Sequence, residues 1–173
     1  MPIKPIEQLI KEKKTEPPKS VRNRFLIGID PDTIKSGIAS FLKQQGVMQD
    51  YSKIKITLLS FFELFEFLKV SKELYGSELL VVIEAGWKNK KSNYHNNETT
   101  PFVREKIAHD IGRNHQSGIH IEEMCLYLDV RHELIQPFSN TQKKKNKEYM
   151  KILFDKNTFN QDKADAAMLI VGM

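Results

Sequence analysis

The chain has 173 residues, of which 40% are apolar and 28% are charged, so it can form one domain with a substantial core and is neither disordered nor fibrous in composition. No apolar run reaches the roughly 18 residues that a membrane span needs, and no secretory signal is visible. The single cysteine, Cys125, excludes an internal disulfide and favours a reducing, cytoplasmic location. A net charge of +5 permits a polyanionic partner without requiring one.

The N-terminal half of the chain predicts a tail followed by a three-stranded meander. Residues 1–22 are basic and interrupted by prolines, so we expect a flexible tail ahead of one domain over 23–173. Apolar runs separated by turn residues predict three antiparallel strands, over 24–30, 37–42 and 53–60.

A helix and a central strand follow the meander. Phe61, Phe65 and Leu68 recur at helical spacing, with Phe62 widening the stripe, so we expect a helix that turns these side chains to the core and ends near Gly76. The continuous apolar run 79–83 predicts a parallel strand buried on both faces.

The remaining elements alternate between helix and strand. Residues 86–100 have no local structural signal, and Thr100 with Pro101 begins a helix predicted through 128, with a break near Gly112 or Gly118. A short strand is expected over 131–137, and two helices over 142–154 and 162–171. The order βββαβαβαα implies an α/β domain with a mixed sheet flanked by helices.

Four acidic residues interrupt this apolar pattern. Asp30 and Glu84 each end a buried strand, and Asp162 and Asp165 share one face of the last helix, where small alanines allow close packing on the sheet. Carboxylates brought together at one sheet edge repel each other unless cations neutralise them, and Mg²⁺ or Mn²⁺ prefers such oxygen ligands. Two such ions about 3.5–4 Å apart can promote phosphodiester hydrolysis.

Each acid also has a simpler interpretation. Asp30 before a proline could form a turn, and Glu84 could face solvent. Asp162 could cap the last helix, with Asp165 complementing its dipole.

Three motifs carry a resemblance to a known family. GIDPDTIKSGIA resembles the GIDPGxxxxG opening of the RuvC-like branch of the ribonuclease H-like superfamily, the Holliday-junction resolvases and their phage and mobile-element relatives. LLVVIEAGW is similar to the family's second motif, and QDKADAAMLIVG to its last. The resemblance covers about residues 24–173.

The resemblance implies a five-stranded mixed sheet of order 3-2-1-4-5 and an endonuclease that uses Mg²⁺ or Mn²⁺ on branched DNA. It also implies that Asp30, Glu84, Asp162 and Asp165 are both the catalytic residues and the metal ligands. Symmetric nicking of a junction would require a homodimer. Asp32 departs from the family pattern, which has glycine there, and adds a fifth carboxylate without an assigned role.

Candidate nucleic-acid contacts lie in three segments. Trp87 stands where family members carry an aromatic that engages the junction, although it could equally be a packing residue. A glycine-containing helical segment, 108–118, contributes Arg113. The lysines expected to bind phosphates without reading sequence are Lys88, Lys90, Lys91, Lys143, Lys144, Lys145 and Lys147.

The sequence is also compatible, to different degrees, with two other functional classes. A catalytically silent nucleic-acid-binding module on the same fold remains an alternative to the nuclease. A sugar-kinase or actin-like ATPase is disfavoured because the chain is too short for two lobes and has no second phosphate loop. Zinc is not expected because the histidines and Cys125 show no ligand spacing.

Overall fold

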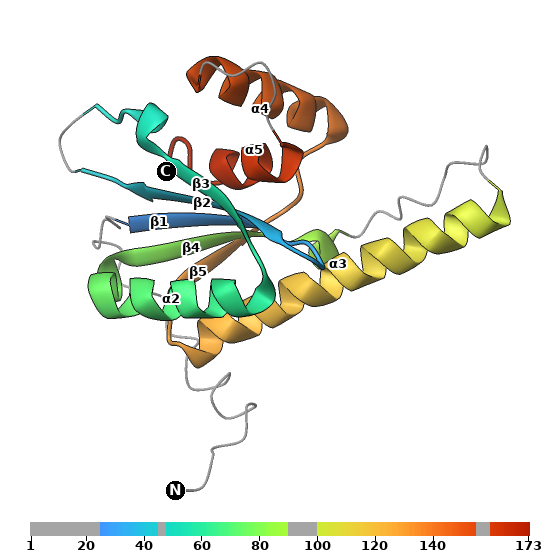
Figure 1. The fold of residues 1–173 in the computed structure, drawn as a ribbon, viewed down its shortest axis with the longest axis horizontal. Helices are drawn as coiled ribbons and strands as arrows, with labels where there is room; N and C mark the ends of the chain where they lie inside the picture. The colour runs from blue at the N-terminus through green and yellow to red at the C-terminus, as the bar shows by residue number, and fades with distance from the viewer. Residues whose placement is uncertain (1–24, 45–47, 90–99, 155–159) are drawn as a thin grey trace, which may run out of the picture.

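Five strands form one mixed sheet at the centre of the molecule (Figure 1). The computed structural model describes residues 25–44, 48–89, 100–154 and 160–173, so the predicted tail over 1–22 lies outside the described residues. The strands are β1 (Phe25–Asp30), β2 (Ser36–Leu42), β3 (Lys55–Leu59), β4 (Leu79–Glu84) and β5 (His132–Ile135). Their order in the sheet is β3-β2-β1-β4-β5, which confirms the predicted α/β class and strand order.

The pairing directions follow from the connections. The turn after β1 leads into β2, and the pairs β1–β2 and β2–β3 are both antiparallel. Helical crossovers precede β4 and β5, so β4 pairs parallel with β1, and β5 parallel with β4. Ile29 of β1 lies beside Ile83 of β4, so the next residues, Asp30 and Glu84, emerge from the same end of neighbouring strands.

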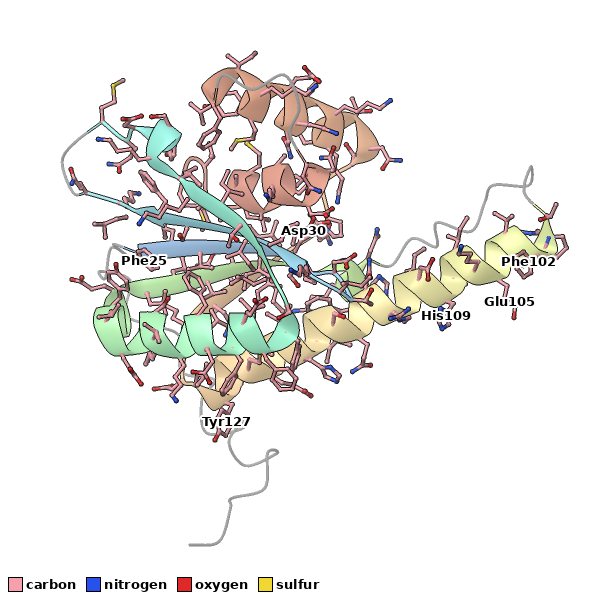
Figure 2. All side chains as sticks on the ribbon, viewed as in Figure 1. Phe25, Asp30, Phe102, Glu105, His109 and Tyr127 are labelled. Atoms are coloured by element: carbon pink, nitrogen blue, oxygen red, sulfur yellow. The ribbon has the colours of Figure 1, made fainter. Side chains whose placement is uncertain are left out.

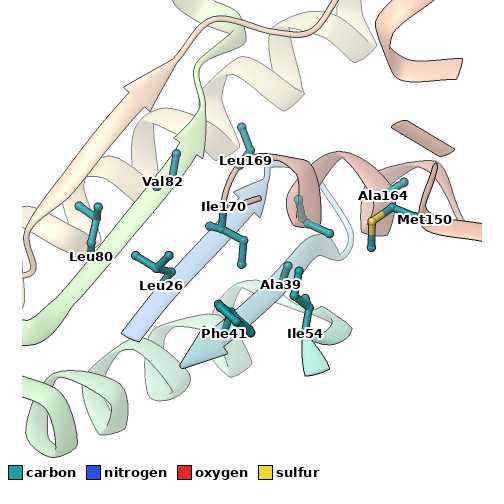
Figure 3. Close-up of a cluster of buried hydrophobic side chains, with 12 residues drawn as sticks. Leu26, Ala39, Phe41, Ile54, Leu80, Val82, Met150, Ala164, Leu169 and Ile170 are labelled. Carbon is teal, nitrogen blue, oxygen red and sulfur yellow. The ribbon is translucent and has the colours of Figure 1, made fainter. Parts of the chain in front are cut away.

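In the described part of the chain, four α-helices cover the sheet, two on each face (Figure 1). They are α2 (Phe61–Tyr75), α3 (Pro101–Tyr127), α4 (Asn140–Leu153) and α5 (Gln161–Met168). Side chains alternate along each strand, so Leu26 and Leu80 pack with α4 and α5, while Ile27 and Val81 pack with α2 and α3. The buried side chains thus form one apolar cluster on each face of the sheet. Figure 3 shows the cluster on the α4–α5 face, with Ile170 and Met150 packed over the sheet.

Helix α5 approaches the sheet more closely than ordinary side chains would allow. A Cβ atom added at Gly28 would lie 2.0 Å from the carbonyl oxygen of Ala166, and one added at Gly37 would lie 2.3 Å from that of Asp162. Ala164 and Ala166 are fully buried at the contact. The small residues on both elements therefore fix α5 against β1 and β2, as the alanines of the last motif led us to expect.

Helix α3 is continuous, which corrects the predicted break near Gly112 or Gly118. Isolated glycines inside a helix lower its stability but leave the hydrogen-bond ladder intact. The N-terminal part of α3 extends beyond the sheet, where Phe102 and His109 can be located in Figure 2. Within the described residues, no helix has both the length and the apolar character that a membrane crossing needs.

The predicted core face of α2 was partly wrong. Its buried residues are Leu64, Leu68 and Ser71, whereas Phe61 is 44% exposed and Phe62 is 79% exposed. Phe61 lies in the first turn, where its ring meets those of Phe62 and of His120 in α3 in edge-to-face arrangements. Phe62 is one position off the buried stripe, so helical geometry turns it to solvent.

Candidate active site

Two carboxylates are presented by the ends of adjacent parallel strands. Asp30 is the last residue of β1 and can be seen at the end of that strand in Figure 2. Glu84 is the last residue of β4, and its side chain is only 7% exposed. Because both strands are buried and hydrogen-bonded along their length, their ends are rigid supports for the two acids. The interpretation of Glu84 as a solvent-facing acid is wrong.

Helix α5 brings a third carboxylate to the same end of the sheet. Asn160 caps the start of the helix, since its side chain accepts a hydrogen bond from the backbone N–H of Lys163, so Asp162 is not the helix cap. Asp165 lies one turn into the helix, and its side chain is 1% exposed. Gln161 Nε2 donates to Asp165 Oδ1 at 2.9 Å and also to the backbone carbonyl of Lys143 at 2.9 Å, which ties α5 to α4.

A lysine lies between two of these acids. Lys143 Nζ donates to Glu84 Oε1 at 2.9 Å and lies 3.1 Å from Asp165 Oδ2. We predicted Lys143 as a surface phosphate contact and missed its place inside the acid cluster. The sequence does contain a pattern that could have revealed this position. Asn146 and Met150, the buried residues of α4, follow Lys143 by three and seven residues, so the lysine lies on the same face of the helix.

The ammonium does not satisfy every buried carboxylate oxygen. Glu84 Oε2 and Asp165 Oδ2 are buried without a hydrogen-bond partner. For Asp165 Oδ2, the lysine nitrogen is within ion-pair distance but is not aligned as a donor, so we treat the contact as electrostatic. Buried carboxylate oxygens without partners are costly, and their presence indicates room for further cationic neutralisation.

Burial and repulsion between like charges raise the pKa values of three of the acids, Asp30, Glu84 and Asp162. Burial raises the pKa of Asp30 to about 8, with Glu84, Asp165 and Asp162 adding to the effect and Lys143 opposing it. Burial likewise raises the pKa of Glu84, against the attraction of Lys143. The pKa of Asp162 is raised by burial and then by the charges of Asp32 and Asp165. For Lys143, burial acts to lower the pKa, but Glu84 and the other acids hold it above its ordinary value.

Asp32 has a structural role at the turn after β1. Its Oδ1 accepts a hydrogen bond from the backbone N–H of Ile34 at 2.9 Å, and its backbone N–H donates to Ser36 Oγ. Among the described residues other than glycine, only Asp129 has a positive φ, so the turn does not require the conformational freedom of glycine at position 32. Asp32 therefore holds the turn and places its charge near Asp162.

The donor chemistry of the cluster fits a hard divalent cation, although its centre is occupied by an amine. Carboxylate oxygens from Asp30, Glu84 and Asp165 are the ligands that Mg²⁺ and Mn²⁺ prefer, and two buried oxygens lack partners. Within the described part of the chain, no group of three or more acidic, histidine or cysteine side chains is already arranged to hold a metal ion.

Trp87 packs against α3. A Cβ atom added at Gly118 would lie 2.2 Å from Cζ3 of the Trp87 ring. The indole therefore fits against the helix only because residue 118 is glycine. The ring is partly buried against the α2–α3 cluster, which agrees with the packing interpretation. Base stacking by its remaining exposed edge stays a prediction.

The other predicted nucleic-acid contacts are dispersed. Lys88 and Arg113 are exposed, and the same holds for Lys144 and Lys145 on α4, whereas Lys147 is half-buried. Lys90 and Lys91 lie outside the described residues. Lys144 and Lys145 directly follow Lys143 in α4, but their side chains are turned to solvent.

No protein-family model matches the chain, and no curated protein matches it in sequence. Two similar solved structures are those of Thermus thermophilus RuvC and of the same protein in complex with a Holliday junction substrate. Each has a TM-score of 0.43, at 14% and 13% sequence identity respectively, and covers 84% of this chain. The matches span 90% and 89% of the RuvC chains.

Proposed function

We propose that this protein is a divalent-metal-dependent endonuclease of the RuvC-like, ribonuclease H-like type that hydrolyses phosphodiester bonds in branched DNA. The observation that carries the proposal is the convergence of Asp30 and Glu84, from matched ends of parallel strands, with the fully buried Asp165 of α5. The three sequence motifs that contain these acids support the choice of nuclease over other metal-dependent chemistry.

In this proposal Asp30, Glu84 and Asp165 hold the metal, and Asp162 contributes from the half-exposed rim. Bound divalent ions supply an activated water and charge neutralisation at the scissile phosphate. The protein supplies rigid positions for the carboxylates, because the strand ends and the Gly28 contact leave α5 little freedom. Asp30, which burial keeps protonated near neutral pH, would have to give up that proton in order to act as a metal ligand.

The DNA would approach along the α4 side of the cluster. Lys144 and Lys145 are exposed there and would contact phosphates without reading the sequence, which suits a substrate recognised by shape. Two paired cuts on a symmetric junction would require a second copy, so a homodimer on the substrate is part of the proposal.

A second candidate function is favoured by one observation. Lys143 already neutralises part of the acid cluster, so two buried carboxylates have a counter-charge from the protein itself. A catalytically silent DNA-binding module could therefore keep the same architecture and the same exposed lysines.

A cleavage panel separates the two candidates. The purified protein is incubated with Mg²⁺ or Mn²⁺ and four-way junction, flap, fork, duplex, single-stranded and RNA–DNA hybrid substrates. We expect junction cleavage that falls at least about 100-fold in Asp30→Asn and Glu84→Gln, with DNA binding retained. Glu66→Gln, at an exposed acid on α2, is the matched control and should cut normally.

Binding without cleavage of any substrate by the natural protein would favour the silent module. Undiminished cleavage by Asp30→Asn would contradict the proposed site, and failure to bind any DNA would contradict both candidates.

A further inference from the structure

We infer that Lys143 is an internal counter-cation that holds the metal position in the metal-free protein and must swing out before the metal can bind. The inference rests on the proposed metal-dependent function. It assigns to Lys143 a positioning role in the carboxylate cluster, distinct from the phosphate contacts of the exposed lysines on the same helix.

The geometry places the ammonium where a cation is required. Its nitrogen lies 2.9 Å from Glu84 Oε1 and 3.1 Å from Asp165 Oδ2, between two carboxylates that are almost fully buried. A divalent ion bound to these oxygens at about 2.0–2.1 Å would occupy nearly the same space. The two cations would also repel each other, so occupancy by one excludes the other.

The lysine is an incomplete substitute for a metal ion. One positive charge faces several carboxyl groups, and Glu84 Oε2 and Asp165 Oδ2 still lack hydrogen-bond partners. A metal ion with twice the charge could engage those lone pairs. The resting arrangement therefore keeps the site folded while leaving ligand capacity that only another cation can use.

The structure also provides a route by which the side chain can leave. Lys143 is 26% exposed, whereas the side chains of Glu84 and Asp165 are 7% and 1% exposed. Its flexible stem can rotate the ammonium to solvent without moving the backbone. The backbone stays in place because Gln161 holds the Lys143 carbonyl, and Asn146 and Met150 anchor the next turns of α4 in the interior.

Metal affinity and metal-free stability should therefore change in opposite directions in Lys143→Met, which removes the charge and keeps an unbranched stem. With chelator present, we expect its thermal midpoint to fall by roughly 5–15 °C, since buried carboxylates lose their counter-ion. In Mn²⁺ titration by calorimetry, we expect about tenfold tighter binding than in the natural protein. Lys144→Met, at an exposed neighbour, should match the natural protein in both measurements.

A folded Lys143→Met variant that binds Mn²⁺ no more tightly than Lys144→Met would overturn the inference while leaving the proposed function intact. If the natural protein and both variants bind no Mn²⁺, the proposed function fails, and the inference fails with it.

A second measurement uses the natural protein and does not depend on the variant folding. Lysine acylation is followed by mass spectrometry, with Lys144 as the internal reference. With chelator, Lys143 should react at least several-fold more slowly than Lys144, and saturating Mg²⁺ should remove most of that protection. Protection of Lys143 that is unchanged by Mg²⁺ binding would show that the ammonium does not leave, which contradicts the inference.

Discussion

The two faces of the sheet are built in different ways. The face that carries α2 and α3 is packed by large side chains such as Ile27, Leu68 and Ile121, all essentially inaccessible to solvent. The face that carries α5 also contains large side chains such as Leu80 and Ile170, but there the backbone of the helix additionally touches the backbone of a strand, with Gly28 beneath Ala166. The candidate site lies only where the second kind of packing occurs.

The difference has a physical reason. Large side chains in a core can adjust their rotamers, so the elements that they separate tolerate small shifts. A helix in contact with a strand through glycine and alanine has no such freedom, and carboxylates on both elements keep a constant separation. The first kind of packing fills the core with apolar side chains, and the second fixes the relative positions of Asp30 and Asp165.

The largest effect is expected from Gly28→Ala. The new methyl would lie 2.0 Å from the Ala166 carbonyl oxygen, which is backbone and can move only with α5. We expect a loss of about 4 kcal/mol or more in the free energy of unfolding, or failure to fold, measured by urea denaturation. Gly112→Ala, where nothing lies within 4 Å of the added atom, should gain about 0.5–1 kcal/mol. Equal behaviour of the two variants would contradict the close approach of α5.

A smaller loss of stability, with the carboxylate site left intact, is expected from Leu68→Ala on the opposite face of the sheet. Leu68 is completely buried, and its truncation should cost about 2–4 kcal/mol through lost burial and a cavity. Because the variant leaves the α5 contact intact, its Mn²⁺ affinity should stay within about twofold of the natural protein. Leu74→Ala, at a 71% exposed position on the same helix, serves as the control and should change stability by less than about 0.5 kcal/mol. Loss of Mn²⁺ binding in folded Leu68→Ala would show that the two faces are coupled.

A third effect is a pH dependence that arises from the acid cluster on the α5 face. Asp30 ionises near pH 3.8 in the unfolded chain but near pH 8 in the folded, metal-free protein, so the unfolded state loses its proton first as pH rises. The natural protein should therefore lose stability relative to Asp30→Asn between about pH 4 and pH 8, by at most about 1.4 kcal/mol per pH unit. Urea midpoints with chelator should coincide near pH 4 and differ most above pH 8. A difference that is independent of pH would mean that Asp30 is not held in its neutral form.

Local patterns were sufficient for much of the architecture. The continuous apolar run that ends at Glu84 required a strand buried on both faces, and the order of strands and helices required a mixed sheet. The same patterns misplaced Phe61 and Phe62, because helical spacing defines a stripe but not how far the neighbouring elements extend to cover it. The predicted break in α3 failed for a related reason, since Gly118 accommodates Trp87 from a distant part of the chain.

The sequence by itself determined which residues end the buried strands and open the last helix, because these properties depend on neighbours along the chain. Only the tertiary structure decided that Asp165 is fully buried, that Asp32 holds a turn, and that Lys143 turns inward to Glu84. Lys143 and Glu84 are 59 residues apart, and a run of lysines looks the same whether one of them faces a carboxylate or solvent. Burial and long-range charge pairing depend on how whole elements pack, and that information is absent from any local pattern.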